Sequence, residues 1–337
     1  MKHGGNFTAA AKAFGFNPAE MIDLSTGIAP RSFPVEGVDL TARHWRDLPQ
    51  TDVEQALIDA MKTHWHCDSA AEVVLAPGSG VVISLAATLP SKIEVMIPDP
   101  VYSEHEIAWA QQGHHVVTYP AGQIPHLTPA AKAIIAVQPG NPTGQINPPQ
   151  DWLAVIDAMA ERGGMVIVDE AFIDIMPEQS LAPMAGRKGL LVIRSFGKFY
   201  GLAGVRLGAA IGHRDDIQRL QQLLGPWAVS TLALDLGLKA IADTAWAESQ
   251  RQWLNQEMTL LHGVLQSAGL AICGGTALYA LAEVGDAQAL HQHLAQHGLW
   301  TRIFDHHPHW MRFGLPATPE ERQRLASALK GWRQDGN

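Results

Sequence analysis

The sequence has few cysteines, no long apolar segment and no block of basic charge. Its 337 residues include two cysteines, Cys67 and Cys273, which lie far apart and show no Cys-x-x-Cys spacing. This pattern argues against a zinc site or a disulfide framework and is typical of a protein of the reducing cytoplasm. The N-terminal segment lacks a continuous apolar core and no stretch approaches about 18 apolar residues, so we expect neither secretion nor a membrane span.

Positive charge is also scarce. There are 24 Lys and Arg against 33 Asp and Glu, and no run of five or more basic residues. A surface for nucleic acid or an anionic membrane is therefore not indicated. The sequence has 16 histidines. Two sequence clusters contain residue types that bind transition metals: Asp305, His306, His307 and His309 form the first, and His64, His66 and Cys67 form the second. So many histidines cluster by chance, and the second group ends a predicted helix, where histidine favours the helix dipole, so we expect no metal site.

The middle of the chain has an α/β pattern. From about residue 65 to 212, apolar runs such as "KAIIAVQ", "MVIVDEAF" and "GLLVIRSF" alternate with helical periodicity. Runs that are apolar throughout suit strands buried on both faces, which predicts a mainly parallel sheet with helical crossovers. A helix is predicted over 51–65, with Thr51 and Glu54 in capping-box spacing.

The chain is too long for one small core. After about residue 215 two long helical stretches, 215–223 and 230–268, lead to short strands, a helix near 287–297 and a final helix opened by Thr318, Pro319 and Glu321. We expect an arm over 1–44 that joins the small domain, a large domain over 45–215, and a small α+β domain over 216–337.

Four segments carry residues of chemical interest at the ends of predicted strands. A glycine turn before a helix could hold a phosphate with its amides, and a hydroxyl with a guanidinium could add donors. A lysine amine suits a carbonyl cofactor, and a buried carboxylate suits a pyridinium nitrogen. Each segment alone also has a simple structural explanation as a turn. The residues concerned are Gly78, Ser79, Gly80, Val81, Asn141, Asp169, Ser195, Lys198 and Arg206.

Their joint spacing is more specific. Asn-Pro-Thr-Gly begins at Asn141, Asp-Glu-Ala-Phe begins 28 residues later at Asp169, Ser-Phe-Gly-Lys ends 29 residues after that at Lys198, and Arg-Leu-Gly begins at Arg206. This order resembles the fold-type I pyridoxal-phosphate enzymes, the aspartate aminotransferase superfamily. The resemblance implies a large domain with a mainly parallel sheet of the seven-stranded type, a small α+β domain, and a homodimer.

The same resemblance implies a role for each residue. Lys198 would hold the cofactor aldehyde as a Schiff base, Asp169 would keep the pyridine nitrogen protonated, and Asn141 would donate a hydrogen bond to ring oxygen O3′. Tyr102, in "PDPVYSEHEIAW", would stack on the ring, although a core aromatic is the alternative. Gly78, Ser79, Gly80, Val81, Ser195 and Arg206 would form the phosphate cup.

The N-terminal "HGGNFTAAAKAFGFNPAEMIDLSTGIAP", with "GPWAVSTLAL", "TRIF" and "WMRFGLP", is similar to the threonine-phosphate decarboxylases of cobalamin synthesis over essentially the whole chain. That resemblance implies conversion of L-threonine O-3-phosphate to (R)-1-amino-2-propanol O-2-phosphate and carbon dioxide. His3, Arg302 and Arg312 would then meet the anionic groups of the substrate, because the arginine fork binds phosphate or carboxylate bidentately. The alternative for both arginines is surface charge at a strand edge.

Several residues depart from the patterns of related enzymes. Phe172 stands where many aminotransferases have a tyrosine that contacts O3′, Gly197 replaces a hydroxyl residue before the lysine, and Leu48 stands where related enzymes have a tyrosine that reaches the neighbouring subunit's cofactor. Gly27 and Ala29 lie in a segment that often contains asparagines. A histidinol-phosphate or aromatic aminotransferase is the alternative activity, and a non-catalytic binding protein on the same fold is a third.

Overall fold

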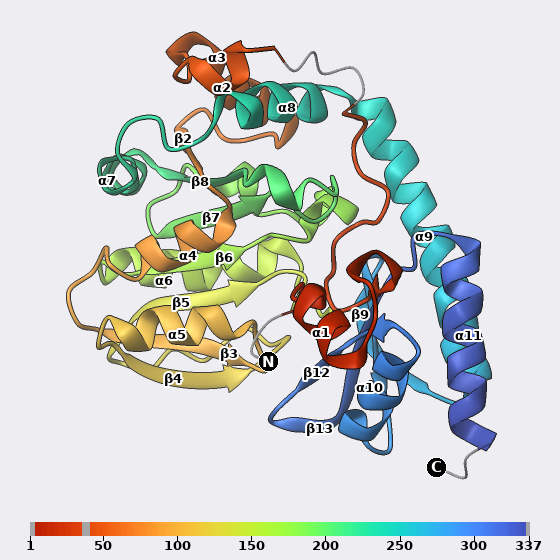
Figure 1. Ribbon diagram of the computed structural model, residues 1–337. Helices are drawn as coiled ribbons and strands as arrows, with labels where there is room; N and C mark the ends of the chain where they lie inside the picture. Colours follow the sequence, from red (N-terminus) through yellow and green to blue (C-terminus); the bar gives the residue numbers. More distant parts are fainter. Residues whose placement is uncertain (1–3, 36–40, 335–337) are drawn as a thin grey trace. The chain divides into compact units, whose positions relative to one another are not determined.

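The computed structural model describes residues 4–35 and 41–334, and within them two compact units. The large unit runs from Ser32 to Ala247, and the small unit combines the segment up to Arg31 with the segment from Glu248 onward. Figure 1 shows the helices and strands of both units.

The large unit is built on a seven-stranded sheet in the order β2-β8-β7-β6-β5-β3-β4. The strands β3 to β7 pair in parallel, whereas β8 pairs antiparallel with both β7 and β2. Most of their buried positions are apolar, as expected for a sheet covered on both faces. The strands are β2 (Ala71–Ala76), β3 (Glu94–Asp99), β4 (His115–Pro120), β5 (Ala131–Val137), β6 (Met165–Asp169), β7 (Leu190–Ser195) and β8 (Gly208–His213).

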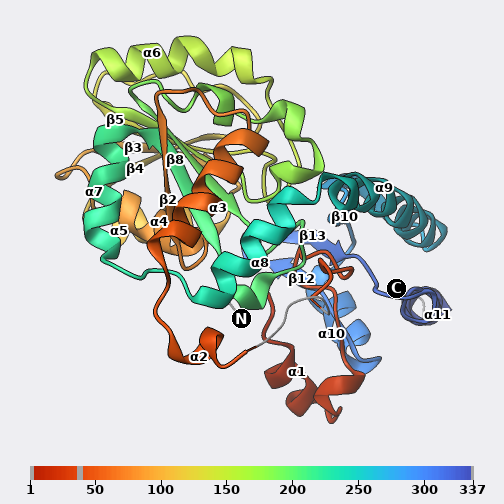
Figure 2. The ribbon, with the colours of Figure 1, turned by 90° about the horizontal axis from the view of Figure 1, so that it is seen from above.

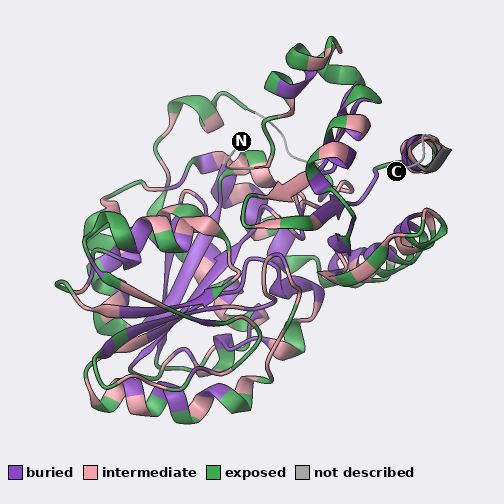
Figure 3. Ribbon diagram, turned by 90° about the horizontal axis from the view of Figure 1, so that it is seen from below, coloured by how far each residue is buried: buried purple, intermediate pink, exposed green. Residues whose placement is uncertain are grey.

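Helices cover both faces of this sheet. The helices α4 (Ser79–Ala86), α5 (Ser103–Gln111) and α7 (Arg214–Leu224) share one core with the strands, to which they contribute Ile83, Trp109 and Leu220. Helix α6 (Leu153–Glu161) packs on β6, and Figure 2 shows it on the side of the sheet opposite α5 and α7. The central strands are accordingly buried along their length (Figure 3).

Three helices of the large unit lie away from the sheet centre. Helix α3 (Thr51–His64) packs against α8 (Thr231–Ala242), and the short α2 (Arg43–Arg46) also contacts α8. The predicted helix over 51–65 is present, but its N-cap is Gln50, and no side chain caps it. Thr51 is the first helical residue rather than the N-cap, so Thr51 and Glu54 do not form the predicted capping box.

The small unit contains a four-stranded antiparallel sheet in the order β12-β13-β10-β9 and a parallel pair, β1 with β11. Its final helix begins as the sequence predicts, because the Thr318 hydroxyl accepts from the Glu321 amide at 3.2 Å. The strands are β1 (Ile22–Asp23), β9 (Ala271–Thr276), β10 (Tyr279–Glu283), β11 (Leu299–Trp300), β12 (Arg302–Phe304) and β13 (His307–Gly314). The helices are α1 (Phe7–Phe14), α10 (Ala287–Gln296) and α11 (Pro319–Gln334), with α9 (Thr244–Ser267) crossing the boundary at 247. Short 3-10 turns lie at Pro18–Glu20, Pro149–Trp152, Ile173–Ile175, Pro177–Gln179, Ala182–Met184 and Ala203–Val205.

The unit boundaries differ from the sequence-based ones at 44 and 215. Helix α7 packs on β2 and β8, and α8 packs on α3, so the chain up to residue 247 stays with the large sheet. The predicted single helical stretch over 230–268 is likewise two helices, α8 and α9, divided at Asp243. Within the described residues, no helix combines the length and apolarity needed to cross a bilayer.

Candidate active site

The chemically interesting residues of the large unit meet at one edge of its sheet. Strands β3, β5, β6 and β7 run in the same direction, so the residues that follow them lie at the same edge. Gly208, the first residue of β8, pairs with Ala76 at the end of β2 on one side and with Ser195 at the end of β7 on the other. The segments after β2 and β7 and before β8 therefore start from neighbouring positions.

Asp169 is the last residue of β6, in the middle of the sheet, and its side chain is buried. One carboxylate oxygen accepts from the Ala171 amide at 3.0 Å, and the other lies 3.0 Å from Nε2 of His105. His105 is itself buried on α5. The carboxylate is thus fixed by two partners in an apolar surrounding, as a group that must face a cationic ring nitrogen should be.

Lys198 lies in the turn after β7, and its side chain is partly buried. Its ammonium nitrogen is 5.6 Å from the ring centroid of Phe172, in the geometry of a cation–π contact. Phe172 follows Asp169 by three residues in the turn after β6. The predicted lysine and the predicted acid therefore stand at the ends of adjacent strands.

The predicted phosphate cup is assembled around the start of α4. Its N-cap, Gly78, has φ of 92°, a conformation that favours glycine, and it lies against the Arg206 guanidinium. Ser79 and Gly80 lie in the first helical turn, where amides have no acceptor within the helix, whereas the Val81 amide lies 3.3 Å from the Gly78 carbonyl. The Ser195 hydroxyl accepts from the Gly197 amide at 3.2 Å, which leaves its proton to be donated. Together these groups form a cationic, donor-rich site suited to a phosphate.

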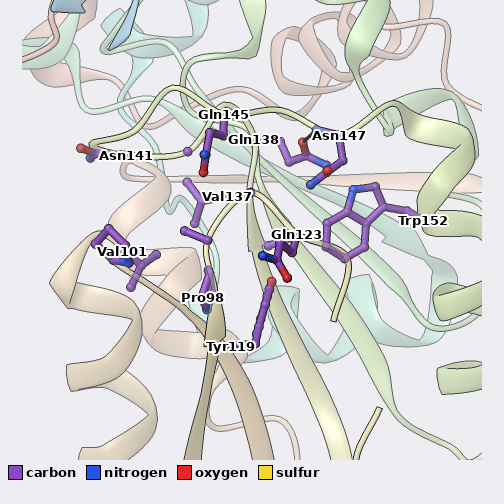
Figure 4. A pocket seen from close by; sticks show the side chains of 15 residues that line it. Pro98, Val101, Tyr119, Gln123, Val137, Gln138, Asn141, Gln145, Asn147 and Trp152 are labelled. Atoms are coloured by element: carbon purple, nitrogen blue, oxygen red, sulfur yellow. Dashed lines mark hydrogen bonds between the residues drawn. The ribbon is translucent and has the colours of Figure 1, made fainter. Parts of the chain in front are cut away.

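Two other predicted residues lie at the same edge. Tyr102 is the N-cap of α5 and is 37% exposed, so it is a surface aromatic at a strand end rather than a core residue. Asn141 lies in the loop after β5 and lines a pocket with Pro98 and Val101 (Figure 4). Tyr102 is exposed and Asn141 partly buried, and both follow the carboxyl ends of parallel strands.

Arg302 and Arg312 belong to the small unit. They are direct cross-strand partners on β12 and β13, which places them on the same face of that sheet. Arg312 is buried, donates to the Ser25 carbonyl at 2.6 Å and lies over the Tyr279 ring. Two like charges therefore stand directly opposite each other on this sheet, an arrangement that is unfavourable by itself. His3 lies outside the described residues.

The sequence interpretation missed three polar residues around this edge. His105 contacts Asp169; Gln138 begins the Asn141 loop; and Arg194, beside Ser195, forms a buried ion pair with Glu170, beside Asp169. Burial raises the pKa of Glu170 against the opposing effect of Arg194. Of the three, only His105 has a signal in the sequence, because it lies one helical turn after the predicted site residue Tyr102.

The structure also gives a reason for Gly197 before the lysine. A Cβ at this position would lie 3.2 Å from the Ala203 backbone, so a hydroxyl residue would be crowded. Leu48 is exposed. Of the two histidine groups, His307 stacks on Trp310 and His309 contacts the Gly285 carbonyl. In the described part of the chain, no three His, Cys, Asp or Glu side chains gather as metal ligands would.

The model of the aminotransferase class I and II family matches residues 25–329. The chain belongs to this family. A threonine-phosphate decarboxylase of Pseudomonas aeruginosa is 36% identical over 335 residues, covering 99% of this chain and 98% of that protein. A histidinol-phosphate aminotransferase of Methanococcoides burtonii is 28% identical over 69% of this chain and 68% of that protein. The crystal structure of histidinol-phosphate aminotransferase from Sinorhizobium meliloti in complex with pyridoxal-5′-phosphate superposes with a TM-score of 0.84 at 18% identity, covering 97% of this chain and 94% of that one. The predicted family and fold are confirmed.

Proposed function

We propose that this protein is a pyridoxal-phosphate-dependent decarboxylase that acts on L-threonine O-3-phosphate and releases (R)-1-amino-2-propanol O-2-phosphate for cobalamin synthesis. The observation that carries the proposal is the similarity to threonine-phosphate decarboxylase along nearly the whole of both chains. This similarity bears out the predicted activity and enzyme class, and family membership bears out the predicted cofactor.

The residues at the edge of the large sheet fit that cofactor. When bound, pyridoxal phosphate supplies an electrophilic carbonyl and a ring that takes up the electron pair left by departing carbon dioxide. The Lys198 amine would hold the carbonyl, and Asp169 would hold a proton on the pyridine nitrogen. Ser79, Gly80, Val81, Ser195 and Arg206, with the turn at Gly78, would bind the phosphate.

Two further groups would orient the ring. Asn141 would donate to O3′, and Tyr102 would stack on one face. Phe172 has no hydroxyl with which to contact O3′, so Asn141 would be the principal donor to that oxygen. The contact with His105 would keep the Asp169 carboxylate in one orientation when the nitrogen is bound.

The substrate is an amino acid with two anionic groups, a carboxylate and a phosphate. Arg302 and Arg312, opposite each other on β12 and β13, offer two guanidinium groups on one face of the small sheet. Anchoring both anions fixes which Cα bond stands perpendicular to the ring, and that bond is the one broken. We include His3 in the substrate site on the family resemblance alone.

We also propose a homodimer located in the cytoplasm. The dimer is supported by exposed apolar side chains that surround the start of α8, with Trp45, Leu48 and Trp227 exposed by 69%, 56% and 59%. The free thiols of Cys67 and Cys273 suit a reducing compartment.

The activity is tested by incubating the purified holoenzyme with threonine O-3-phosphate and measuring carbon dioxide. We expect release without any keto acid. Turnover of histidinol phosphate that requires 2-oxoglutarate and yields no carbon dioxide would instead assign an aminotransferase.

The role of Lys198 is tested in the same assay. Lys198→Ala should remove the visible cofactor absorbance and lower kcat by at least about a thousandfold, because the amine that holds the carbonyl is gone. Lys188→Ala, which changes an exposed lysine ten residues earlier, should behave as wild type. Cofactor absorbance that survives in the Lys198 variant would exclude this lysine as the attachment point.

A further inference from the structure

The loop that carries Asn141 is closed on itself by the side chain of its first residue. Gln138 directly follows β5, and its Oε1 accepts from the backbone amide of Asn147 at 2.7 Å. Inside this closure the Gly140 amide donates to the Gln145 carbonyl at 2.8 Å. These two contacts close the ten-residue segment from 138 to 147 into a loop that carries Asn141 (Figure 4).

The closing residue is also tied to the strand of Asp169. The Gln138 backbone amide donates to the Asp169 carbonyl at 2.9 Å, and Val137 pairs with Asp169 across β5 and β6. The Gln138 side chain is 1% exposed. One buried residue thus joins the loop of Asn141 to the strand end that presents Asp169.

Gln138 lines a small pocket at the carboxyl ends of β3, β4 and β5. Within the described chain, neither Nε2 of Gln138 nor the buried Nε1 of Trp152 has a protein acceptor. Gln123 and Gln145 line the same pocket and are exposed, whereas these two donors are buried. The Asn147 contact fixes which way the amide points, since a flipped amide would set two donors against each other.

We propose that Gln138 is a positioning residue for the cofactor: its side-chain oxygen sets the Asn141 loop, and through it the hydrogen bond from Asn141 to ring oxygen O3′. The proposal rests on the role given to Asn141 in the proposed function. Gln138 touches neither the cofactor nor the substrate in this scheme. It acts by removing the alternative conformations of a ten-residue loop before the ring binds.

The test compares two substitutions of nearly equal size. Gln138→Met has no acceptor for the Asn147 amide, whereas Gln138→Glu keeps one. We expect Gln138→Met to raise the Kd for pyridoxal phosphate about tenfold and to shift the visible absorption maximum of the saturated holoenzyme, because the contact at O3′ is loosened. Gln138→Glu should restore the maximum and keep Kd within about threefold of wild type. Gln123→Met, the same change at an exposed amide of the same pocket, should alter neither.

Asn141→Ala, measured in parallel, separates the possible failures. If Asn141→Ala shifts the absorption maximum and Gln138→Met does not, the positioning role is wrong and the proposed site stands. If Asn141→Ala changes nothing, the assigned role of Asn141 fails and the positioning role fails with it. A Gln138→Met protein that melts earlier but binds with the wild-type Kd and maximum has lost only stability, which also overturns the proposal. Carbon dioxide release enters none of these readouts, so a different substrate would leave the conclusion intact.

Discussion

At the scale of single residues, the most informative contact is that between His105 and Asp169. The two are 64 positions apart, and both are buried. Asp169 was predictable because the acid follows an apolar strand in a motif with fixed spacing to Lys198. His105 was not, because a histidine between two glutamates of a helix gives no sign of what it faces until the helix is packed on the sheet.

This contact gives a prediction for catalysis. His105→Phe should lower kcat about tenfold to a hundredfold, because a hydrogen bond to a charged group contributes about 1.5–3 kcal/mol. The substitution fills the space but cannot hold the carboxylate, so the Kd for pyridoxal phosphate should rise as well. Steady-state kinetics and cofactor titration measure the two effects. His126→Phe, at an exposed histidine of the same unit, is the control. Wild-type kcat in His105→Phe would show that Asp169 needs no second partner.

At the scale of elements, a buried ion cluster joins β7 to the segment that follows β6. Arg194 of β7 is 1% exposed, pairs with Glu170 at 3.3 Å and with Asp174, and lies 4.4 Å from the centroid of the Trp65 ring. Glu170 also accepts from the Ser180 hydroxyl at 2.6 Å. The sequence predicted both strands from their apolar runs. It did not predict this cluster, because pairing between side chains depends on which strands become neighbours.

The ion cluster gives a prediction for stability. Arg194→Met should lower the free energy of unfolding by about 3–5 kcal/mol, since it leaves buried carboxylates without their cation. Arg187→Met, at an exposed arginine paired with Asp157 at 3.5 Å, should cost less than about 1 kcal/mol. Urea denaturation of the two variants measures the difference. Equal losses would mean that the buried cluster contributes no more than a surface pair.

In the small unit, the contact between His291 of α10 and Thr301, which follows β11, predicts a pH effect. Burial lowers the pKa of His291 to about 4, and its Nδ1 lies 2.8 Å from the Thr301 hydroxyl. The unfolded chain binds a proton at this histidine below about pH 6.5, whereas the folded chain does so only near pH 4. Its contribution to stability is therefore fully present above about pH 6.5 and is lost as the pH falls towards 4.

His291→Gln removes this titration and can keep a hydrogen bond to Thr301. Between pH 7 and 4.5 the variant should lose less stability than wild type, as measured by thermal unfolding at each pH. His306→Gln, at an exposed histidine of the same unit, should follow the wild-type curve. Parallel curves for His291→Gln and wild type would contradict the lowered pKa.

At the scale of the whole molecule, the two-unit organisation was predicted but its boundaries were placed elsewhere. Composition and periodicity show where strands give way to helices, near residue 215. They do not show that α7 and α8 return to the large sheet and to α3, because those contacts join segments far apart in the sequence. The described residues up to Arg31 and those from Glu248 onward form one unit for the same reason.

Association of two copies of the chain at this surface would bury the exposed apolar side chains around α8. The Asp47 carbonyl accepts from the Thr231 hydroxyl at 3.1 Å, and Arg43 and His44 both pair with Asp235, so the segment with Trp45 and Leu48 is fixed beside the start of α8. Large apolar side chains held rigidly in solvent mark association surfaces.

We therefore expect the protein to sediment at about twice its chain mass of 36.5 kDa. The double substitution Trp45→Asp and Leu48→Asp should shift sedimentation towards the monomer, because it places charge in an apolar contact. Leu260→Asp changes a residue that is also exposed, by 47%, but belongs to the small unit, and it should leave the dimer intact. A wild-type monomer at micromolar concentration would reject the dimer. A dimer that tolerates the double substitution would place the association surface away from α8.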